Sequence, residues 1–111
     1  MIADSHVEIH AARLMTYHAA DRCDRGLPYH VEASAVKLYA NAMSLRVIDR
    51  AIQIHGGMGL SKELPLERMF RDLRSRLITE GSQEMQRMLG VNYLGRLTSI
   101  ILAGGSEACL V

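Results

Sequence analysis

A glycine-rich segment and a single carboxylate are the parts of this sequence whose residue types could do chemistry. Residues 51–59 read Ala-Ile-Gln-Ile-His-Gly-Gly-Met-Gly, and residues 78–84 read Ile-Thr-Glu-Gly-Ser-Gln-Glu. Clustered glycines leave backbone amides open to a ligand, because no side chain stands in the way. Gln53, one helical turn before the glycines, carries an amide that can both donate and accept hydrogen bonds. The segment is therefore a candidate ligand site.

Helix termination is the alternative explanation for these glycines. A helix commonly ends at a glycine whose left-handed backbone satisfies the last carbonyls. The pattern is not the dinucleotide-binding fingerprint of a strand, a turn and a helix, because the apolar run before the glycines is too long for a strand. The residues alone leave both a helix end and a ligand site open.

Glu80 stands in a setting that suits a general base. Gly81 beside it would let a ligand approach the backbone, and Ser82 begins a helix whose free amides could bind an oxyanion or a phosphate. A carboxylate held in such a place can take a proton from a reacting carbon. The alternative is a solvated carboxylate in a turn, which is the usual situation of a Glu.

Helices must position both segments. Apolar residues recur at helical spacing over residues 2–25 and again over residues 29–55, with a turn at Gly26 and Pro28 between the two runs. Long helices joined by a short turn favour antiparallel neighbours. The positions that recur at helical spacing in the first run are Val7, Ala11, Leu14, Met15 and His18 or Ala19, and the stripe in the second run is Ala35, Leu38, Ala42, Leu45, Ile48 and Ile52.

The second half of the chain is expected to hold two further helices. Residues 56–64 read as a glycine-punctuated loop, and Pro65 opens a short helix that runs to about Leu73. Ser82 is the expected N-cap of a last helix that runs through Leu97. We therefore predict an all-α, antiparallel up-and-down helical bundle over residues 1–103, followed by a loosely held tail over residues 104–111.

Composition agrees with helices and argues against several classes of function. Hydrophobic residues make up 49% of the chain and aromatic residues only 5%, which favours close-packed helices over a β-sandwich. The 13 basic and 12 acidic residues nearly cancel, so nothing indicates capture of nucleic acid or of an anionic membrane. The longest apolar stretch, residues 100–103, is too short for a membrane span, and no export signal is visible.

Metal binding is not expected either. Cys23 and Cys109 lie far apart and belong to no Cys/His ligand spacing, which favours a reduced, intracellular chain. The histidines at positions 6, 10 and 18 fall at helical intervals, but a metal site would need a further ligand beside them. Histidine is also common on partly buried helix faces, and this explains the three histidines more simply than a metal site does.

Together the two segments resemble the C-terminal helical domain of the acyl-CoA dehydrogenase family of flavoproteins. In that family a Gln-x-x-Gly-Gly-x-Gly stretch precedes a Lys-Glu-x-Pro-x-Glu-Arg-x-x-Arg-Asp block, and Glu-Gly-Thr-x-Glu/Gln-x-x-Arg follows. The matching blocks here are Gln53-Ile-His-Gly-Gly-Met-Gly59, Lys62-Glu-Leu-Pro-Leu-Glu-Arg-Met-Phe-Arg-Asp72 and Glu80-Gly-Ser-Gln-Glu-Met-Gln-Arg87. The resemblance extends over residues 1–97.

The resemblance implies a role for each matching residue. Glu80 corresponds to the catalytic base that removes the α-proton of an acyl-CoA thioester while the β-hydrogen leaves as hydride to the flavin, and Gly81 lies against the substrate. The stretch that contacts the FAD of the same subunit is matched by Ser82, Gln83 and Glu84. The stretch that holds the FAD of a neighbouring subunit is matched by Gln53, Ile54, His55, Gly56 and Gly57.

Partners and location follow from the same resemblance. It implies an acyl-CoA substrate, a homo-oligomer (a dimer or a tetramer), and an electron-transfer flavoprotein as electron acceptor, in the bacterial cytoplasm or the mitochondrial matrix. The family's N-terminal helical domain and central β-domain have no counterpart in these 111 residues, so we expect the isolated chain to be inactive. Two alternatives stay open: an acyl-CoA oxidase-like flavoenzyme that reacts with oxygen, and a non-catalytic helical module that serves in assembly.

Overall fold

The structure, a computed structural model, describes residues 1–102, with side chains described through residue 95. Within these residues every regular element is a helix, which confirms the all-α prediction. The expected tail, residues 104–111, lies outside the described residues. The elements are α1 (Ile2–Asp24), α2 (His30–His55), the 3-10 helix η1 (Gly56–Leu60), α3 (Leu66–Arg76) and α4 (Gln83–Leu102).

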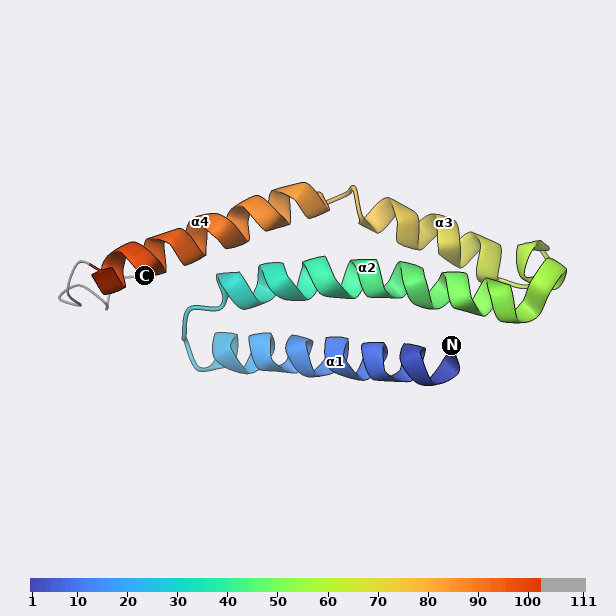
Figure 1. Cartoon of the computed structure of the whole chain (residues 1–111), viewed down its shortest axis with the longest axis horizontal. Helices are drawn as coiled ribbons and strands as arrows, with labels where there is room; N and C mark the ends of the chain where they lie inside the picture. Colours follow the sequence, from blue (N-terminus) through green and yellow to red (C-terminus); the bar gives the residue numbers. More distant parts are fainter. Residues whose placement is uncertain (103–111) are drawn as a thin grey trace.

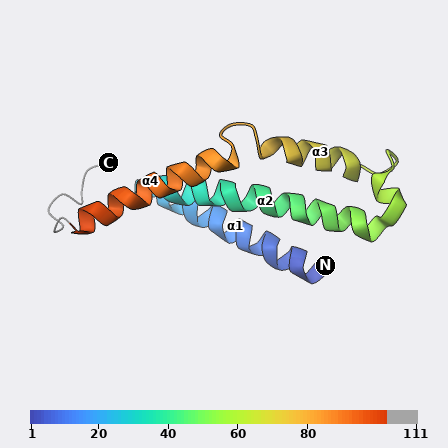
Figure 2. The ribbon, with the colours of Figure 1, turned by 45° about the horizontal axis from the view of Figure 1, so that its top comes forward.

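Helix α2 is the central element of the molecule. Helix α1 lies along one side of it, and α3 and α4 follow one another along another side, each running opposite to α2 (Figures 1 and 2). Within residues 1–102, α1 makes no contact with α3 or α4, so α2 alone joins the two sides. The last two helices thus form one interrupted row, and the molecule extends over 60 × 24 × 22 Å.

The middle of the chain holds more helix than expected. The segment predicted as a loop begins with η1, which turns back from the end of α2. Helix α3 runs to Arg76, beyond the predicted end at Leu73, and its last turn contains Arg74 and Arg76. Basic side chains stabilise this end of a helix because the helix dipole is negative there.

The buried face of α1 agrees with the predicted stripe only in part. Ala19, which belongs to that stripe, is buried, and so is Ala12, which does not, whereas Val7 and Leu14 are 65% and 55% exposed. Small side chains let two helix backbones approach closely, and the charged residues that pair with α2 lie on the same face as the alanines. The contact with α2 therefore follows Ala12, Ala19 and these ion pairs, while the larger apolar side chains turn outward.

Helix α2 buries residues on two faces because it is covered from two sides. Ile48, which belongs to the predicted stripe, is buried, and so is Met43, which does not. Ala35, at the start of that stripe, is exposed. A single stripe is the pattern of a helix with one covered face, so it describes only part of α2.

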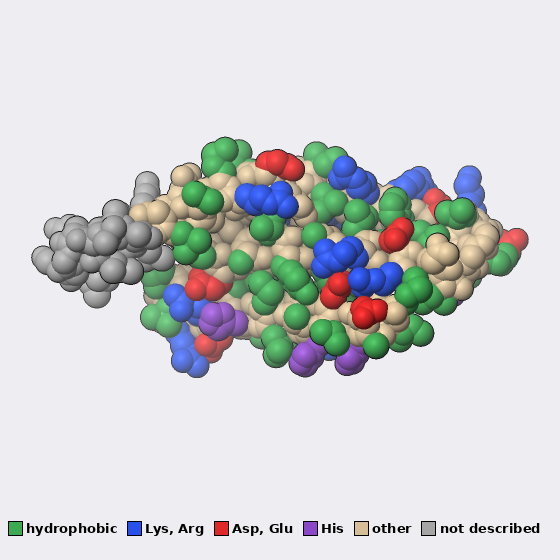
Figure 3. Space-filling model, in the orientation of Figure 1, with side chains coloured by type: hydrophobic (Ala, Val, Ile, Leu, Met, Phe, Trp, Pro, Cys, Tyr) green, Lys and Arg blue, Asp and Glu red, His purple; other side chains and the backbone are tan. Residues whose placement is uncertain are grey.

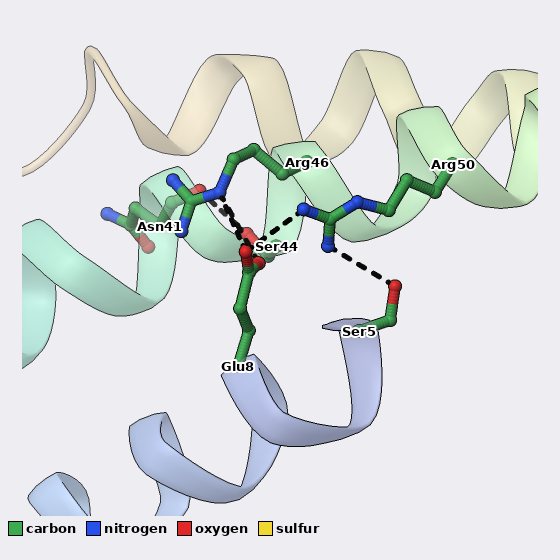
Figure 4. A network of polar contacts seen from close by, with 6 residues as sticks. All are labelled: Ser5, Glu8, Asn41, Ser44, Arg46 and Arg50. Atoms are coloured by element: carbon green, nitrogen blue, oxygen red, sulfur yellow. Dashed lines mark hydrogen bonds and ion pairs between the residues drawn. The ribbon is translucent and has the colours of Figure 1, made fainter. Parts of the chain in front are cut away.

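A polar network ties α1 to the C-terminal half of α2 (Figure 4). Glu8 of α1 pairs with Arg50 at 3.0 Å and with Arg46 at 3.3 Å, and Arg50 also donates a hydrogen bond to the Ser5 hydroxyl. The hydrogen bond from Arg50, followed by the nearby charge of Arg46, holds the pKa of the Glu8 carboxyl below its usual value. Together these contacts fix how α1 is rotated against α2.

Many large apolar side chains lie on the surface (Figure 3). On α1 they include Val7, Leu14 and Tyr17, and on α4 they include Met88 and Val91. None of the helices in the described part of the chain is long and apolar enough to cross a membrane. Exposed apolar area of this kind is typical of surfaces that contact other protein.

Candidate functional site

The glycine segment forms the end of α2 and the turn into η1. Gly56 ends the helix with φ 58° and ψ −139°, and its backbone N–H donates to the carbonyl of Gln53. The five predicted site residues here are all exposed to solvent: Gln53, Ile54, His55, Gly56 and Gly57. A ligand could therefore reach both the Gln53 amide and the backbone beyond it.

The three glycines have different reasons to be glycine. Gly56 needs a positive φ, which other residues rarely adopt. Gly59 is buried, and a Cβ there would stand 2.6 Å from the carbonyl oxygen of Ile52. Gly57 has neither constraint, because its φ is not positive and a Cβ would meet no atom within 4 Å. Helix termination and packing thus explain two glycines and leave Gly57 as open backbone.

His55 is oriented by its own helix. Its Nδ1 lies 2.8 Å from the carbonyl oxygen of Ala51. Because a carbonyl can only accept, Nδ1 carries a proton in this contact, and Nε2 is the nitrogen that accepts in the neutral ring.

Glu80 sits at the tip of the turn between α3 and α4. Its φ of 56° makes it the one non-glycine residue with positive φ within residues 1–102, and Gly81 follows at φ 93°. A left-handed backbone costs an L-residue about 1–2 kcal/mol. The Glu80 side chain is exposed. Strained backbone of this kind is concentrated at functional sites.

Residues 82–84 form the start of α4. The Ser82 hydroxyl accepts a hydrogen bond from the N–H of Met85 at 3.4 Å, which confirms Ser82 as the N-cap. Hydrogen bonds from its own backbone amide, and then from Ser82, lower the pKa of the Glu84 carboxyl. Gln83 instead faces α2, where its amide donates to the carbonyl of Leu38 at 3.5 Å.

Sequence reasoning missed the α2 side chains that hold this turn. Lys37 donates to the backbone carbonyl of Glu80, and Asn41 donates to the carbonyl of Arg76 at 3.1 Å. One signal was present: Lys37 is the single charged residue in the stretch 33–45. A lone cation inside a neutral helical run has no acidic partner nearby on its own helix, which favours a hydrogen bond to a polar group from another part of the chain.

The two predicted segments do not meet within one chain. Glu80 contacts Lys37, which precedes Gln53 by 16 residues on the same helix. At the α-helical rise these positions lie about 24 Å apart along the axis of α2. One small chemical group therefore cannot contact both segments of one chain.

Metal ligands do not gather in the described residues. His6 and His10 stack on one another with ring centroids 6.5 Å apart, but within residues 1–102 no three His, Cys, Asp or Glu side chains are placed to share a metal ion.

Comparison with known proteins assigns this geometry to a family. The family model for the acyl-CoA dehydrogenase C-terminal domain matches residues 1–94. The chain belongs to the acyl-CoA dehydrogenase family. The resemblance seen in the three sequence blocks is thereby confirmed, and so is the helical fold of this C-terminal domain.

Several acyl-CoA dehydrogenase relatives are similar over most of this chain. The short-chain specific acyl-CoA dehydrogenase of Clostridium acetobutylicum is 42% identical over 89 residues, which are 80% of this chain and 24% of that protein. Subunit CarC of the caffeyl-CoA reductase-Etf complex of Acetobacterium woodii shows the same identity over the same shares. The structure of butyryl-CoA dehydrogenase from Megasphaera elsdenii has a TM-score of 0.81 at 39% identity, covering 85% of this chain and 24% of that one. The chain thus spans about a quarter of the length of the relatives it matches.

Proposed function

We propose that this chain acts as the C-terminal domain of an FAD-dependent acyl-CoA dehydrogenase, with Glu80 as the general base. The observation that carries the proposal is the strained turn at Glu80 and Gly81, with the Glu80 side chain exposed, directly before the capped start of α4, in a chain of this family. A module that served only in assembly would give no reason for a glutamate with a left-handed backbone at this position.

The proposed chemistry is removal of two hydrogens from an acyl-CoA. The Glu80 carboxylate takes the α-proton, the electrons of that C–H bond form the new double bond, and the β-hydrogen departs as hydride. FAD, when bound, supplies the hydride acceptor. Gly81 adds no side chain of its own beside the base, and the place where its Cβ would stand is already taken by the Gln86 amide at 2.8 Å, with the Lys37 ammonium at 3.9 Å. Backbone N–H groups in this turn would polarise the thioester carbonyl and make the α-carbon more acidic.

The residues proposed to hold FAD suit that task. Gly57 offers backbone with open space around it, and the exposed amide of Gln53 can donate and accept. In line with the family resemblance, we assign these residues, which lie about 24 Å along α2 from the Glu80 turn, to the FAD of a neighbouring subunit. We assign the FAD of the same subunit to the start of α4, at Ser82, Gln83 and Glu84.

The exposed apolar surface supports an assembly. Val7, Leu14 and Tyr17 are 65%, 55% and 65% exposed on α1. We propose that the remaining domains of the enzyme and further subunits cover such surfaces in a homo-oligomer. An electron-transfer flavoprotein is the proposed electron acceptor, in line with the name of the CarC relative, which is a subunit of a complex with Etf.

Glu80→Gln in the complete flavoenzyme tests the role of the base. The variant should keep its FAD, because the side chain stays the same size, and should lose turnover by about 10²–10⁴-fold, because an amide cannot accept the α-proton. The matched control is Glu63→Gln, an exposed carboxylate in the turn after η1. Wild-type turnover of Glu80→Gln would remove Glu80 from the mechanism. Rapid reoxidation of the reduced enzyme by oxygen would favour the oxidase-like alternative.

The isolated chain provides a second test. It carries the proposed base but only part of a flavin pocket, so it should not retain FAD through gel filtration. Yellow colour that co-elutes with the chain in stoichiometric amount would contradict this expectation.

A further inference from the structure

The turn that carries Glu80 is attached to α2 from both of its ends. The attachments join residues that lie at least 35 positions apart in the sequence, so the fold and not the local chain brings them together. They are the hydrogen bonds from Asn41 to the carbonyl of Arg76, from Lys37 to the carbonyl of Glu80, and from Gln83 to the carbonyl of Leu38.

The bond from Lys37 is made at the strained residue itself. Glu80 has a left-handed backbone, which an L-residue adopts only when its surroundings hold it there. The Lys37 ammonium donates to the Glu80 carbonyl, and its Nζ would stand 3.9 Å from a Cβ on Gly81. The amide of Gln86 lies on the same side of Gly81, 2.8 Å from that Cβ position. The Glu80–Gly81 peptide is therefore covered by two polar side chains.

Lys37 is directed at this carbonyl rather than at an acidic partner. In the part of the chain whose side chains are described, its polar contact is the Glu80 carbonyl, and no carboxylate forms an ion pair with it. Hydrogen bonds from a charged donor are about twice as strong as those between neutral groups. Lys37 is also half-buried on α2, which limits the places its ammonium can reach.

We propose that Lys37 is a positioning residue for Glu80: its ammonium holds the Glu80 carbonyl, maintains the left-handed backbone, and so sets where the Glu80 carboxylate stands. The catalytic part of this inference rests on the proposed function, in which Glu80 is the base. The conformational part does not, because it concerns contacts within this chain.

The conformational part is tested by nuclear magnetic resonance on the 111-residue chain. The sequence offers a matched internal control, since Lys62 is exposed and is the other lysine. The ammonium protons of Lys37 should exchange with water on the order of tenfold more slowly than those of Lys62, because they are held by an acceptor. Equal exchange rates in the wild-type chain would overturn the proposal without any variant.

Variants test whether Lys37 maintains the conformation of Glu80. The one-bond Cα–Hα coupling of Glu80 distinguishes positive from negative φ. Lys37→Met should shift this coupling toward the negative-φ value, while Lys37→Arg, which keeps a charged donor, and Lys62→Met should leave it unchanged. An unchanged coupling in a folded Lys37→Met chain would overturn the proposal, and so would a shifted coupling in Lys62→Met.

The catalytic part is tested in the complete flavoenzyme. Lys37→Met should lower kcat by about tenfold to a hundredfold with little change in KM, because a displaced base reacts less often with a bound substrate. Lys37→Arg should recover most of that loss. If Glu80→Gln abolishes turnover and Lys37→Met does not change it, the positioning role is refuted and the base stands. If Glu80→Gln turns over normally, the proposed function fails whatever Lys37 does.

Discussion

Gly59→Ala should destabilise this chain, whereas Gly57→Ala should not, although the two glycines lie two residues apart. A Cβ on Gly59 would stand 2.6 Å from the carbonyl oxygen of Ile52 and 2.9 Å from its Cα, where ordinary contact begins at 3.4 Å. Both atoms belong to backbone, so η1 must lift away from α2 to relieve the clash. A Cβ on Gly57 would meet nothing within 4 Å.

The size of the effect follows from these contacts. Overpacking costs about 1–3 kcal/mol, and replacing glycine by alanine returns about 0.4–1 kcal/mol by restricting the unfolded chain. The midpoints of these ranges give a net loss at Gly59 of roughly 1.3 kcal/mol, which lowers the melting temperature of a domain this size by roughly 5–10 °C. At Gly57 there is no clash, so only the stabilisation from restricting the unfolded chain applies, and the melting temperature should rise by a few degrees.

Gly56→Ala completes the series, because Gly56 has space around it but a positive φ. Its cost is conformational and should be about 1–3 kcal/mol. The assay is thermal and urea unfolding followed by far-ultraviolet circular dichroism on the three variants and the wild type. The reasoning is refuted if Gly59→Ala melts at or above the wild-type temperature, or if Gly57→Ala falls as far as Gly59→Ala.

Two further predictions concern single contacts. The pKa of Glu8 is lowered in the folded chain, so its ion pairs should contribute stability above about pH 4.5, its ordinary value, and that contribution should disappear as the pH falls through the folded pKa. The stability difference between wild type and Glu8→Gln should therefore shrink below pH 4.5, and a difference that does not vary with pH would contradict this. Ser82→Ala should weaken the start of α4 by about 0.5–1 kcal/mol and speed hydrogen exchange at the Met85 amide, whereas Ser82→Thr keeps the hydroxyl and should not.

The sequence was sufficient to locate the helices and the residues that begin and end them, because helix periodicity and capping depend on neighbouring residues in the chain. Periodicity gave the two long helices, Gly56 marked the end of one, and Ser82 marked the start of the last. Periodicity did not show that α2 is covered on two sides, since Met43 is buried by the way the other helices pack around it. It also placed only part of the buried face of α1 correctly: Ala19 is buried, but Val7 and Leu14 are exposed, because that face follows ion pairs whose partners lie on α2.

The candidate site, like the fold, could be predicted from the sequence only in part. The types and spacing of the residues were enough to choose Glu80, Gly81 and the glycine segment for attention. They could not separate the roles of the three glycines, because the constraint on Gly59 is the distance to the backbone of Ile52. Nor could they pair Lys37 with Glu80, since 43 residues separate the two and only the packing of the turn onto α2 joins them.

Helix α2 carries the Glu80 turn near one end and the glycine segment at the other. It therefore fixes both the distance between these two segments along its axis and the angle between them around that axis. Deleting one residue between Lys37 and Gln53 would shorten the separation by only about 1.5 Å but would rotate one end against the other by about 100°. The glycine segment would then point toward a different side of the molecule while lying at almost the same height. The length of α2 between these points therefore determines the direction in which the chain presents its second segment, and changes there would need to come in whole helical turns.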